Sequence, residues 1–258
     1  MNFDILSLSV IQGISEILPI SSSVNLYFFS KLFGIANFSF SLKVALHAGS
    51  LITLLVYFRR EIADIFRGLF GRKSISETYF WPLVLGTIPV VIFGYLARDF
   101  VKEFDSPYIM GISSIVFGIL LVTFDKLSVK ARAFKKPISL TKSFFVGCFQ
   151  TIAIFPGVSR LGICTTASRM LSIERKEAIN FSLMLAISSI CGSLFLEIAD
   201  CIKSSNFGVF SSESMLGIVL TAIIGIIVIL PCVRFMERRG FVELALYRIL
   251  IGAAICLM

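Results

Sequence analysis

The chain has 258 residues, of which 57% are hydrophobic and 16% charged, and its mean hydropathy is +0.92. A soluble domain of this length needs a polar shell that this composition cannot supply, so a soluble enzyme is excluded. A bilayer solvates apolar side chains directly, and a chain of this size holds roughly six helical crossings of about 20 residues. The formal net charge is +8, but the basic residues stand in short loops between apolar runs, a pattern typical of cytoplasmic loops. We therefore expect no nucleic-acid partner.

Two apolar segments are interrupted, and six others are long enough to cross a membrane. The interrupted segments, 3–34 and 143–172, each carry Pro, Gly, several Ser and one strongly polar residue near the middle. The predicted crossings are 41–58, 80–97, 108–125, 178–198, 215–233 and 242–258. The sequence therefore predicts an all-α integral membrane protein whose single polytopic domain spans residues 1–258.

Loop charges predict how these segments are oriented. Five basic residues lie in 59–79 and six in 126–142, whereas 98–107 and 199–214 each hold more acidic than basic residues. The positive-inside bias places the first two loops in the cytoplasm and the other two outside. The second interrupted segment must then enter the bilayer from the cytoplasm and return there, while the first enters and leaves on the outside. We predict two re-entrant helical segments of opposite orientation beside the six transmembrane helices.

The two interrupted segments also resemble each other. Gln12 is followed by an apolar stretch, Pro19 and serines, and Gln150 is followed in the same way by Pro156 and Ser159. Oppositely oriented repeats with broken helices are typical of inverted-repeat membrane proteins, whose site lies where the breaks meet. Non-helical backbone is tolerated at that depth only where it faces protein or a water-filled cavity, so both breaks should line one pocket.

The first break offers a carboxylate and hydroxyls. Gln12 and Glu16 are four residues apart and share a helix face. Pro19 ends that helix or begins the next one, which places Ser21 and Ser22 at a new N-terminus, where N–H groups and hydroxyls bind phosphate. A carboxylate inside a membrane is costly, so Glu16 is a functional candidate unless it lies at the interface and is merely solvated.

The second break offers a cation on flexible backbone. Gly157 and Gly162 allow close backbone approach, Ser159 can donate a hydrogen bond, and Arg160 supplies a planar fork suited to phosphate oxygens. An arginine between apolar runs needs a partner. Either Arg160 pairs with Glu16, or the two residues together hold a phosphate and its metal.

Two further polar residues stand apart from the breaks. His47 is the only histidine, and near the start of a crossing it is as often a helix–helix hydrogen-bonding residue as a catalyst. Arg248 is expected to snorkel toward the interface. Ser168 and Arg169 are expected to form a cytoplasmic cap.

With these motifs the sequence resembles the undecaprenyl-diphosphate phosphatases of bacteria, membrane enzymes linked to bacitracin resistance. The resemblance covers nearly the whole chain and is carried by the stretches 12–23, 44–49, 86–89, 156–160, 178–182 and 246–250. It implies hydrolysis of undecaprenyl diphosphate, a polyprenyl diphosphate, to the monophosphate, which recycles the carrier lipid for cell-wall synthesis. It also implies stimulation by a divalent cation, Ca²⁺ or Mg²⁺. We expect a multi-pass protein of the bacterial plasma (inner) membrane and leave a homodimer open.

The resemblance also assigns roles. By the family pattern, Glu16 and Gln12 are the cation ligands. Ser21 and Ser22 are the family's serine pair, with Ser22 favoured as the nucleophile. Ser159 and Arg160, beside Gly157 and Gly162, form the phosphate-binding loop. Direct attack by an activated water is equally compatible with these residues.

The sequence departs from the family pattern at the first break. Asn25 stands where a catalytic histidine is usual, Leu161 replaces a serine, and Cys164 replaces a threonine. Asparagine only orients or hydrogen-bonds, and loss of a general base lowers rates by about 10²–10⁴-fold. Three explanations of this departure are open: Glu16 acts as the base without the histidine, His47 takes the place of the histidine, or the chain is a weakened or inactive relative. A non-hydrolytic carrier or flippase and a scaffold for cell-wall enzymes are the alternatives.

Overall fold

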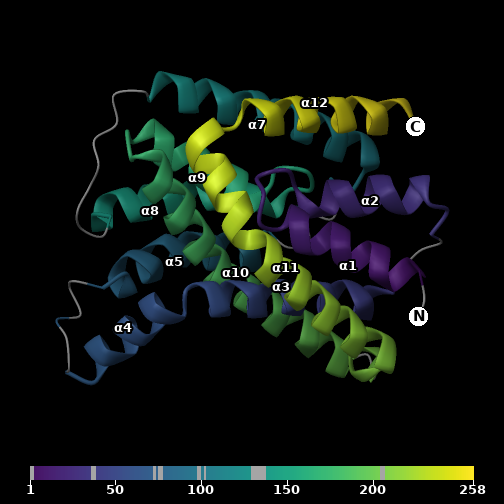
Figure 1. The fold of residues 1–258 in the computed structure, drawn as a ribbon, viewed down its shortest axis with the longest axis horizontal. Helices are drawn as coiled ribbons and strands as arrows, with labels where there is room; N and C mark the ends of the chain where they lie inside the picture. Colours follow the sequence, from purple (N-terminus) through teal and green to yellow (C-terminus); the bar gives the residue numbers. More distant parts are fainter. Residues whose placement is uncertain are drawn as a thin grey trace.

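The computed structural model describes residues 3–35, 39–71, 74, 78–97, 100–101, 103–128, 138–203 and 207–258, and these residues are folded almost entirely as helices (Figure 1). In chain order the helices are α1 (Phe3–Ser15), α2 (Ser22–Leu32), α3 (Phe40–Tyr57), α4 (Arg59–Leu69), α5 (Phe80–Leu96), α7 (Pro107–Leu127), α8 (Leu140–Gln150), the 3-10 helix η2 (Thr151–Ile154), α9 (Arg160–Met170), α10 (Arg175–Lys203), the 3-10 helix η3 (Phe207–Phe210), α11 (Ser212–Arg239) and α12 (Val242–Leu257). The prediction of an all-α protein is confirmed for this part of the chain.

Four of these helices, α3, α7, α10 and α11, are long and apolar enough to cross a membrane. They cover four of the six predicted crossings, so the chain is a multi-pass membrane protein. The other two predicted crossings are helices α5 and α12, with 17 and 16 residues. At about 1.5 Å per residue each is roughly 25 Å long, slightly less than the hydrocarbon core of a bilayer. Their crossing stays a prediction.

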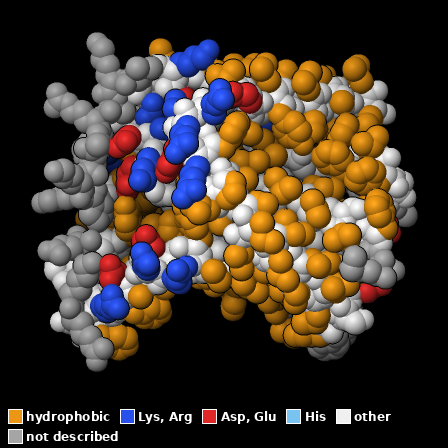
Figure 2. All heavy atoms as spheres, viewed as in Figure 1, with side chains coloured by type: hydrophobic (Ala, Val, Ile, Leu, Met, Phe, Trp, Pro, Cys, Tyr) orange, Lys and Arg blue, Asp and Glu red, His pale blue; other side chains and the backbone are white. Residues whose placement is uncertain are grey.

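The surface agrees with this assignment. Figure 2 shows hydrophobic side chains over most of one face, with Lys and Arg side chains gathered toward one end. Such a distribution suits a bilayer with one basic, cytoplasmic end. Residues 72–73 and 129–137, which carry much of the predicted loop charge, lie outside the described residues.

The two interrupted segments are broken where the sequence predicts. In the first, α1 ends at Ser15 and α2 begins after Ser21, whose φ and ψ are 65° and 102°. In the second, α8 and η2 are followed by α9, which begins after Ser159 with φ and ψ of 69° and 112°. Non-glycine residues rarely adopt positive φ. The two breaks therefore share an unusual backbone conformation at matching serines, as expected of related segments.

Helix α3 packs closely on α11 through small residues. A Cβ atom at Gly49 would lie 2.6 Å from the Ile218 carbonyl oxygen and 2.7 Å from the Thr221 Cβ. Thr53 adds a hydrogen bond from its hydroxyl to the Ala222 carbonyl at 3.3 Å. Small residues allow membrane helices to approach closely, because lipid gives no hydrophobic force between them.

A buried ion network joins the ends of α7, α9, α10 and α11. The Asp125 carboxylate on α7 pairs with Arg169 Nε at 2.9 Å and with Arg175 Nη2 at 2.7 Å. Arg169 also donates to the carbonyls of Ile173 and Ser128 at 2.6 and 2.9 Å. Arg169 is therefore a structural residue, which agrees with the predicted cap.

Candidate functional site

The turns of the two interrupted segments meet, and one arginine joins them. The segments approach from opposite ends of the molecule, and their turns lie near its middle (Figure 1). Arg248 on α12 is fully buried. Its Nη1 donates to the Pro19 carbonyl at 3.0 Å, and its Nη2 donates to the Gly157 and Val158 carbonyls at 3.0 and 2.9 Å. Its Nε donates to the Ser114 carbonyl on α7 at 3.1 Å.

These bonds bear on two predictions. The expectation that Arg248 snorkels to the interface is wrong, because its guanidinium is needed by carbonyl groups that the broken helices leave without partners. Both turns bind one side chain and therefore lie together, while the prediction that they line one pocket stays a prediction.

Glu16 stands where the two turns face each other. Its Oε2 accepts a hydrogen bond from Gln12 Nε2 at 3.1 Å, and the Ser22 hydroxyl also interacts with the carboxylate. The positively charged Arg160 and the His47 ring both act electrostatically on it. Glu16 is partly exposed, whereas Gln12 is fully buried. The carboxylate is therefore held in place by protein donors at the first turn.

Arg160 occupies the first position of α9 and acts electrostatically on Glu16. Its Nη1 is buried and, among the described residues, has no hydrogen-bond partner. The Ser159 hydroxyl caps this helix by accepting from the Gly162 N–H at 3.2 Å. A buried, unpartnered donor is costly, and a guanidinium at a helix N-terminus is well suited to phosphate oxygens. Arg160 and the start of α9 therefore offer an anion-binding site.

The glycines of the second turn leave room for this arrangement. Gly157 has a φ of 89°, and a Cβ there would clash with the Met110 carbonyl. A Cβ at Gly162 would lie 2.9 Å from Arg248 Nη1. Both glycines allow the turn to pack against α7 and Arg248, which agrees with the predicted close backbone approach.

The serines of the first turn differ in exposure. Ser21 is buried, and its hydroxyl pairs with that of Ser23 at 3.1 Å. Ser22 is partly exposed and faces Glu16. Ser22 is therefore the better placed of the predicted pair for attack on a bound phosphate.

Asn25 is a brace within the first segment. It is buried, and its Nδ2 donates to the Ile20 and Ser21 carbonyls at 3.0 and 2.9 Å. Its Oδ1 accepts from the Tyr247 hydroxyl. The amide thus supports the backbone at Ser21 from α12, and its role in catalysis stays a prediction.

His47 lies on α3, beside the first turn. Its Nδ1 lies 2.9 Å from the Lys43 carbonyl oxygen, which can only accept, so this nitrogen carries the proton. The His47 ring also acts electrostatically on Glu16, so it lies near that carboxylate.

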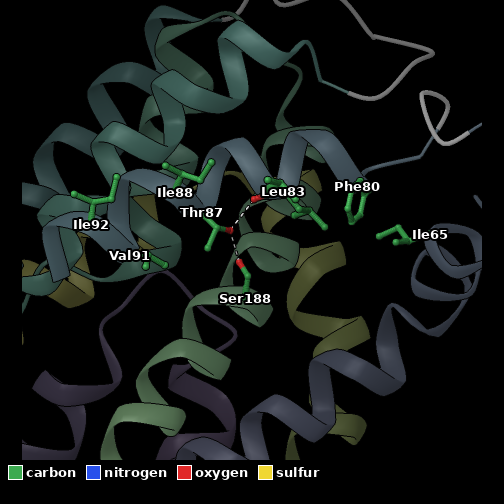
Figure 3. A pocket seen from close by; sticks show the side chains of 9 residues that line it. Ile65, Phe80, Leu83, Thr87, Ile88, Val91, Ile92 and Ser188 are labelled. Carbon is green, nitrogen blue, oxygen red and sulfur yellow. Dashed lines mark hydrogen bonds between the residues drawn. The ribbon is translucent and has the colours of Figure 1, made fainter. Parts of the chain in front are cut away.

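A separate cavity of about 470 Å³ lies between α4, α5 and α10 (Figure 3). Its lining is apolar apart from two hydroxyl groups, Thr87 and Ser188, which pair with each other at 2.6 Å. Thr87 also donates to the Leu83 carbonyl at 2.7 Å. The cavity offers a ligand hydrocarbon contact, and both of its hydroxyl groups are already hydrogen-bonded, so the candidate site stays at the two turns.

The structure adds two residues to the predicted set, Arg248 and Tyr247. Both lie in the stretch 246–250, which the family resemblance includes. Their side-chain chemistry alone did not reveal a role, since an arginine or tyrosine in an apolar helix is equally compatible with an interfacial position.

The chain matches a known protein family and is similar to a named relative. A family model described as "Bacitracin resistance protein BacA" matches residues 5–254. An undecaprenyl-diphosphatase from Alcanivorax borkumensis is 32% identical to this chain over 262 residues, covering 98% of this chain and 97% of that protein.

Proposed function

Because the chain belongs to the bacitracin resistance protein BacA family, we propose that it hydrolyses undecaprenyl diphosphate to undecaprenyl phosphate and inorganic phosphate. This reaction recycles the carrier lipid of cell-wall synthesis and confers bacitracin resistance. The family and the similarity to an undecaprenyl-diphosphatase favour hydrolysis over the carrier and scaffold alternatives.

The observation that carries the site assignment is the buried Arg160 Nη1, which has no hydrogen-bond partner among the described residues and belongs to a guanidinium that acts electrostatically on Glu16. The terminal phosphate of the lipid binds Arg160 and the N–H groups at the start of α9. These donors stabilise the negative charge on the transferring phosphoryl group. The positive φ at Ser159 and Ser21 starts α9 and α2 abruptly, and Arg248 joins the turns that precede both helices.

Ser22 and Glu16 carry out the transfer. The Ser22 hydroxyl attacks the terminal phosphorus while Glu16 accepts its proton. The bond between that phosphorus and the bridging oxygen breaks, and undecaprenyl phosphate leaves. Water then attacks the phosphoserine and releases inorganic phosphate. Direct attack by a water that Glu16 activates needs the same residues and bypasses the phosphoserine.

We also propose the full topology. Six helices, α3, α5, α7, α10, α11 and α12, cross the bacterial inner membrane. The α1–α2 segment enters from the outside and the α8–α9 segment from the cytoplasm, as two halves of one inverted repeat. The matching φ angles at Ser21 and Ser159 support this relation. A homodimer stays a prediction that light scattering of the purified protein tests.

The reaction is tested by measuring phosphate release from undecaprenyl diphosphate in detergent with Ca²⁺ or Mg²⁺. Glu16→Gln removes the base and should lower the rate by about 10²–10⁴-fold, and Arg160→Ala should lower it by about 10²–10³-fold. The exposed residues Glu243 and Arg67 provide matched controls as Glu243→Gln and Arg67→Ala, which should leave the rate unchanged. Release that survives both site substitutions would refute the site. Folded wild type that binds the lipid without releasing phosphate would favour the carrier alternative.

A further inference from the structure

The predicted divalent cation meets an unusual set of ligands in this chain. Ca²⁺ takes six to eight oxygen ligands, and Mg²⁺ is bound through one or two carboxylates together with phosphates and water. Of the predicted site residues, Glu16 alone carries a carboxylate. The described residues also contain no group of three or more His, Cys, Asp or Glu side chains that could hold a metal.

Gln12, the second predicted ligand, turns its amide nitrogen toward Glu16, whereas a cation needs an oxygen ligand. Its Nε2 contacts Glu16 Oε2 at 3.1 Å and Ser50 Oγ at 3.3 Å. The Ser50 hydroxyl donates its own proton to the Leu46 carbonyl, so it can only accept from Gln12. Both neighbours are acceptors, which places the N–H₂ group toward Glu16 and leaves the buried Oε1 without a hydrogen-bond partner among the described residues. A cation between Gln12 and Glu16 would therefore meet a donor group.

Positive charge also lies near Glu16 already. Arg160 and His47 both act on the carboxylate, and Arg160 is positively charged. A divalent cation added to one carboxylate beside a guanidinium meets repulsion that little else in the site offsets. A diphosphate adds several negative charges and supplies phosphate oxygens as ligands, which removes this obstacle.

From these contacts we infer that the free protein has no preformed cation site and that the cation enters with the diphosphate of the lipid. This inference rests on the proposed function, because it takes the diphosphate as the ligand. Glu16 then gives the cation one carboxylate ligand, phosphate oxygens and water give the others, and Gln12 holds the carboxylate in place.

The test is calcium binding, measured by equilibrium dialysis of the purified protein in detergent. The probe is the methylenebisphosphonate analogue of farnesyl diphosphate, which cannot be hydrolysed at its bridging position. Wild type should bind Ca²⁺ with a Kd above about 1 mM on its own, and should bind one equivalent at least about tenfold more tightly with the analogue. Saturable binding of one Ca²⁺ without the analogue, lost in Glu16→Gln, would overturn the inference. Equal binding of the analogue in EDTA would also overturn it.

The variant Gln12→Glu tests the inference by a gain of calcium binding. A second carboxylate beside Glu16 should create a site in the free protein and tighten Ca²⁺ binding at least about tenfold without the analogue. Gln150→Glu is the matched control, since Gln150 is equally buried but bonds the Gly86 carbonyl and Cys164. It should gain no Ca²⁺ affinity. Folded Gln12→Glu that gains no more affinity than Gln150→Glu would refute the argument from Gln12. These outcomes are independent of phosphate release, whose absence would instead refute the proposed function.

Discussion

Replacing Arg248 by methionine removes the side chain that joins the two turns. The Pro19, Gly157 and Val158 carbonyls each lose a hydrogen bond from the guanidinium. A buried polar group left without a partner costs about 1–3 kcal/mol, so the three together cost about 3–9 kcal/mol. Relief from burying a charge offsets part of this, and we expect a net loss of about 3–5 kcal/mol in the free energy of unfolding.

Such a loss should lower Tm by roughly 6–20 °C in a chain of this size. The assay is thermal unfolding in detergent followed by circular dichroism, beside phosphate release. Separation of the turns by even about 1 Å should lower kcat roughly 10²-fold, because the phosphate contacts come from one turn and the nucleophile from the other. Arg248→Lys should lie between wild type and Arg248→Met, since one ammonium cannot reach all the carbonyls.

The exposed Arg67 supplies the control for this experiment. Arg67→Met makes the same chemical change on a surface residue and should shift Tm by less than about 2 °C. An Arg248→Met protein with the Tm and kcat of wild type would show that the two turns hold together without the guanidinium, and would refute the reasoning.

Three further predictions concern the support around the site. Asn25→Ala should lower kcat and leave KM nearly unchanged in steady-state kinetics, because it releases the backbone beside the Ser22 nucleophile. Tyr247→Phe removes one hydrogen bond to Asn25 and should lower the free energy of unfolding by only about 1 kcal/mol, which unfolding curves measure. Gly49→Ala should destabilise the protein by about 1–3 kcal/mol, because its Cβ would lie 2.6 Å from a carbonyl oxygen of α11. Gly192→Ala is the control and should not destabilise the protein, because a Cβ at Gly192 would have no atom within 4 Å. Equal Tm values for the two variants would contradict this packing. Asp125→Asn should cost about 3–5 kcal/mol in unfolding free energy, because it leaves two arginines without their buried carboxylate.

The membrane class, four helices of crossing length and the two breaks follow from the sequence, whereas helix α4 forms in the stretch 59–79 that the sequence indicated as a loop. Apolar runs of crossing length, interrupted at Pro19 and Pro156, are local properties, and proline and glycine punctuate helices whatever surrounds them. The likeness of the two segments is also local, and it predicted that both breaks share one pocket. Glu16 and Arg160 were identified because charged residues inside apolar segments are costly and therefore carry a function by default.

Other features depend on contacts between distant segments. Arg248 lies 229 residues from Pro19 and 91 from Gly157 in the chain, and no local pattern predicts that its guanidinium reaches both carbonyls. The orientation of the Gln12 amide depends on Ser50, another distant residue. Asn25 stands where the family pattern has a histidine, and its bonds to the Ile20 and Ser21 carbonyls and from the distant Tyr247 identify it as a brace.

The sequence by itself therefore determined the membrane class, the four apolar helices long enough to cross and the two breaks, because hydrophobicity and backbone restriction act within a few residues. The tertiary structure alone decided which buried donors and acceptors satisfy one another across the two turns. Hydrogen bonds act only over about 3 Å and in fixed directions, so their partners are set by how the helices pack. The sequence therefore cannot show that Arg160 Nη1 lacks a hydrogen-bond partner in the described part of the chain, because that depends on which groups the folded helices place beside it.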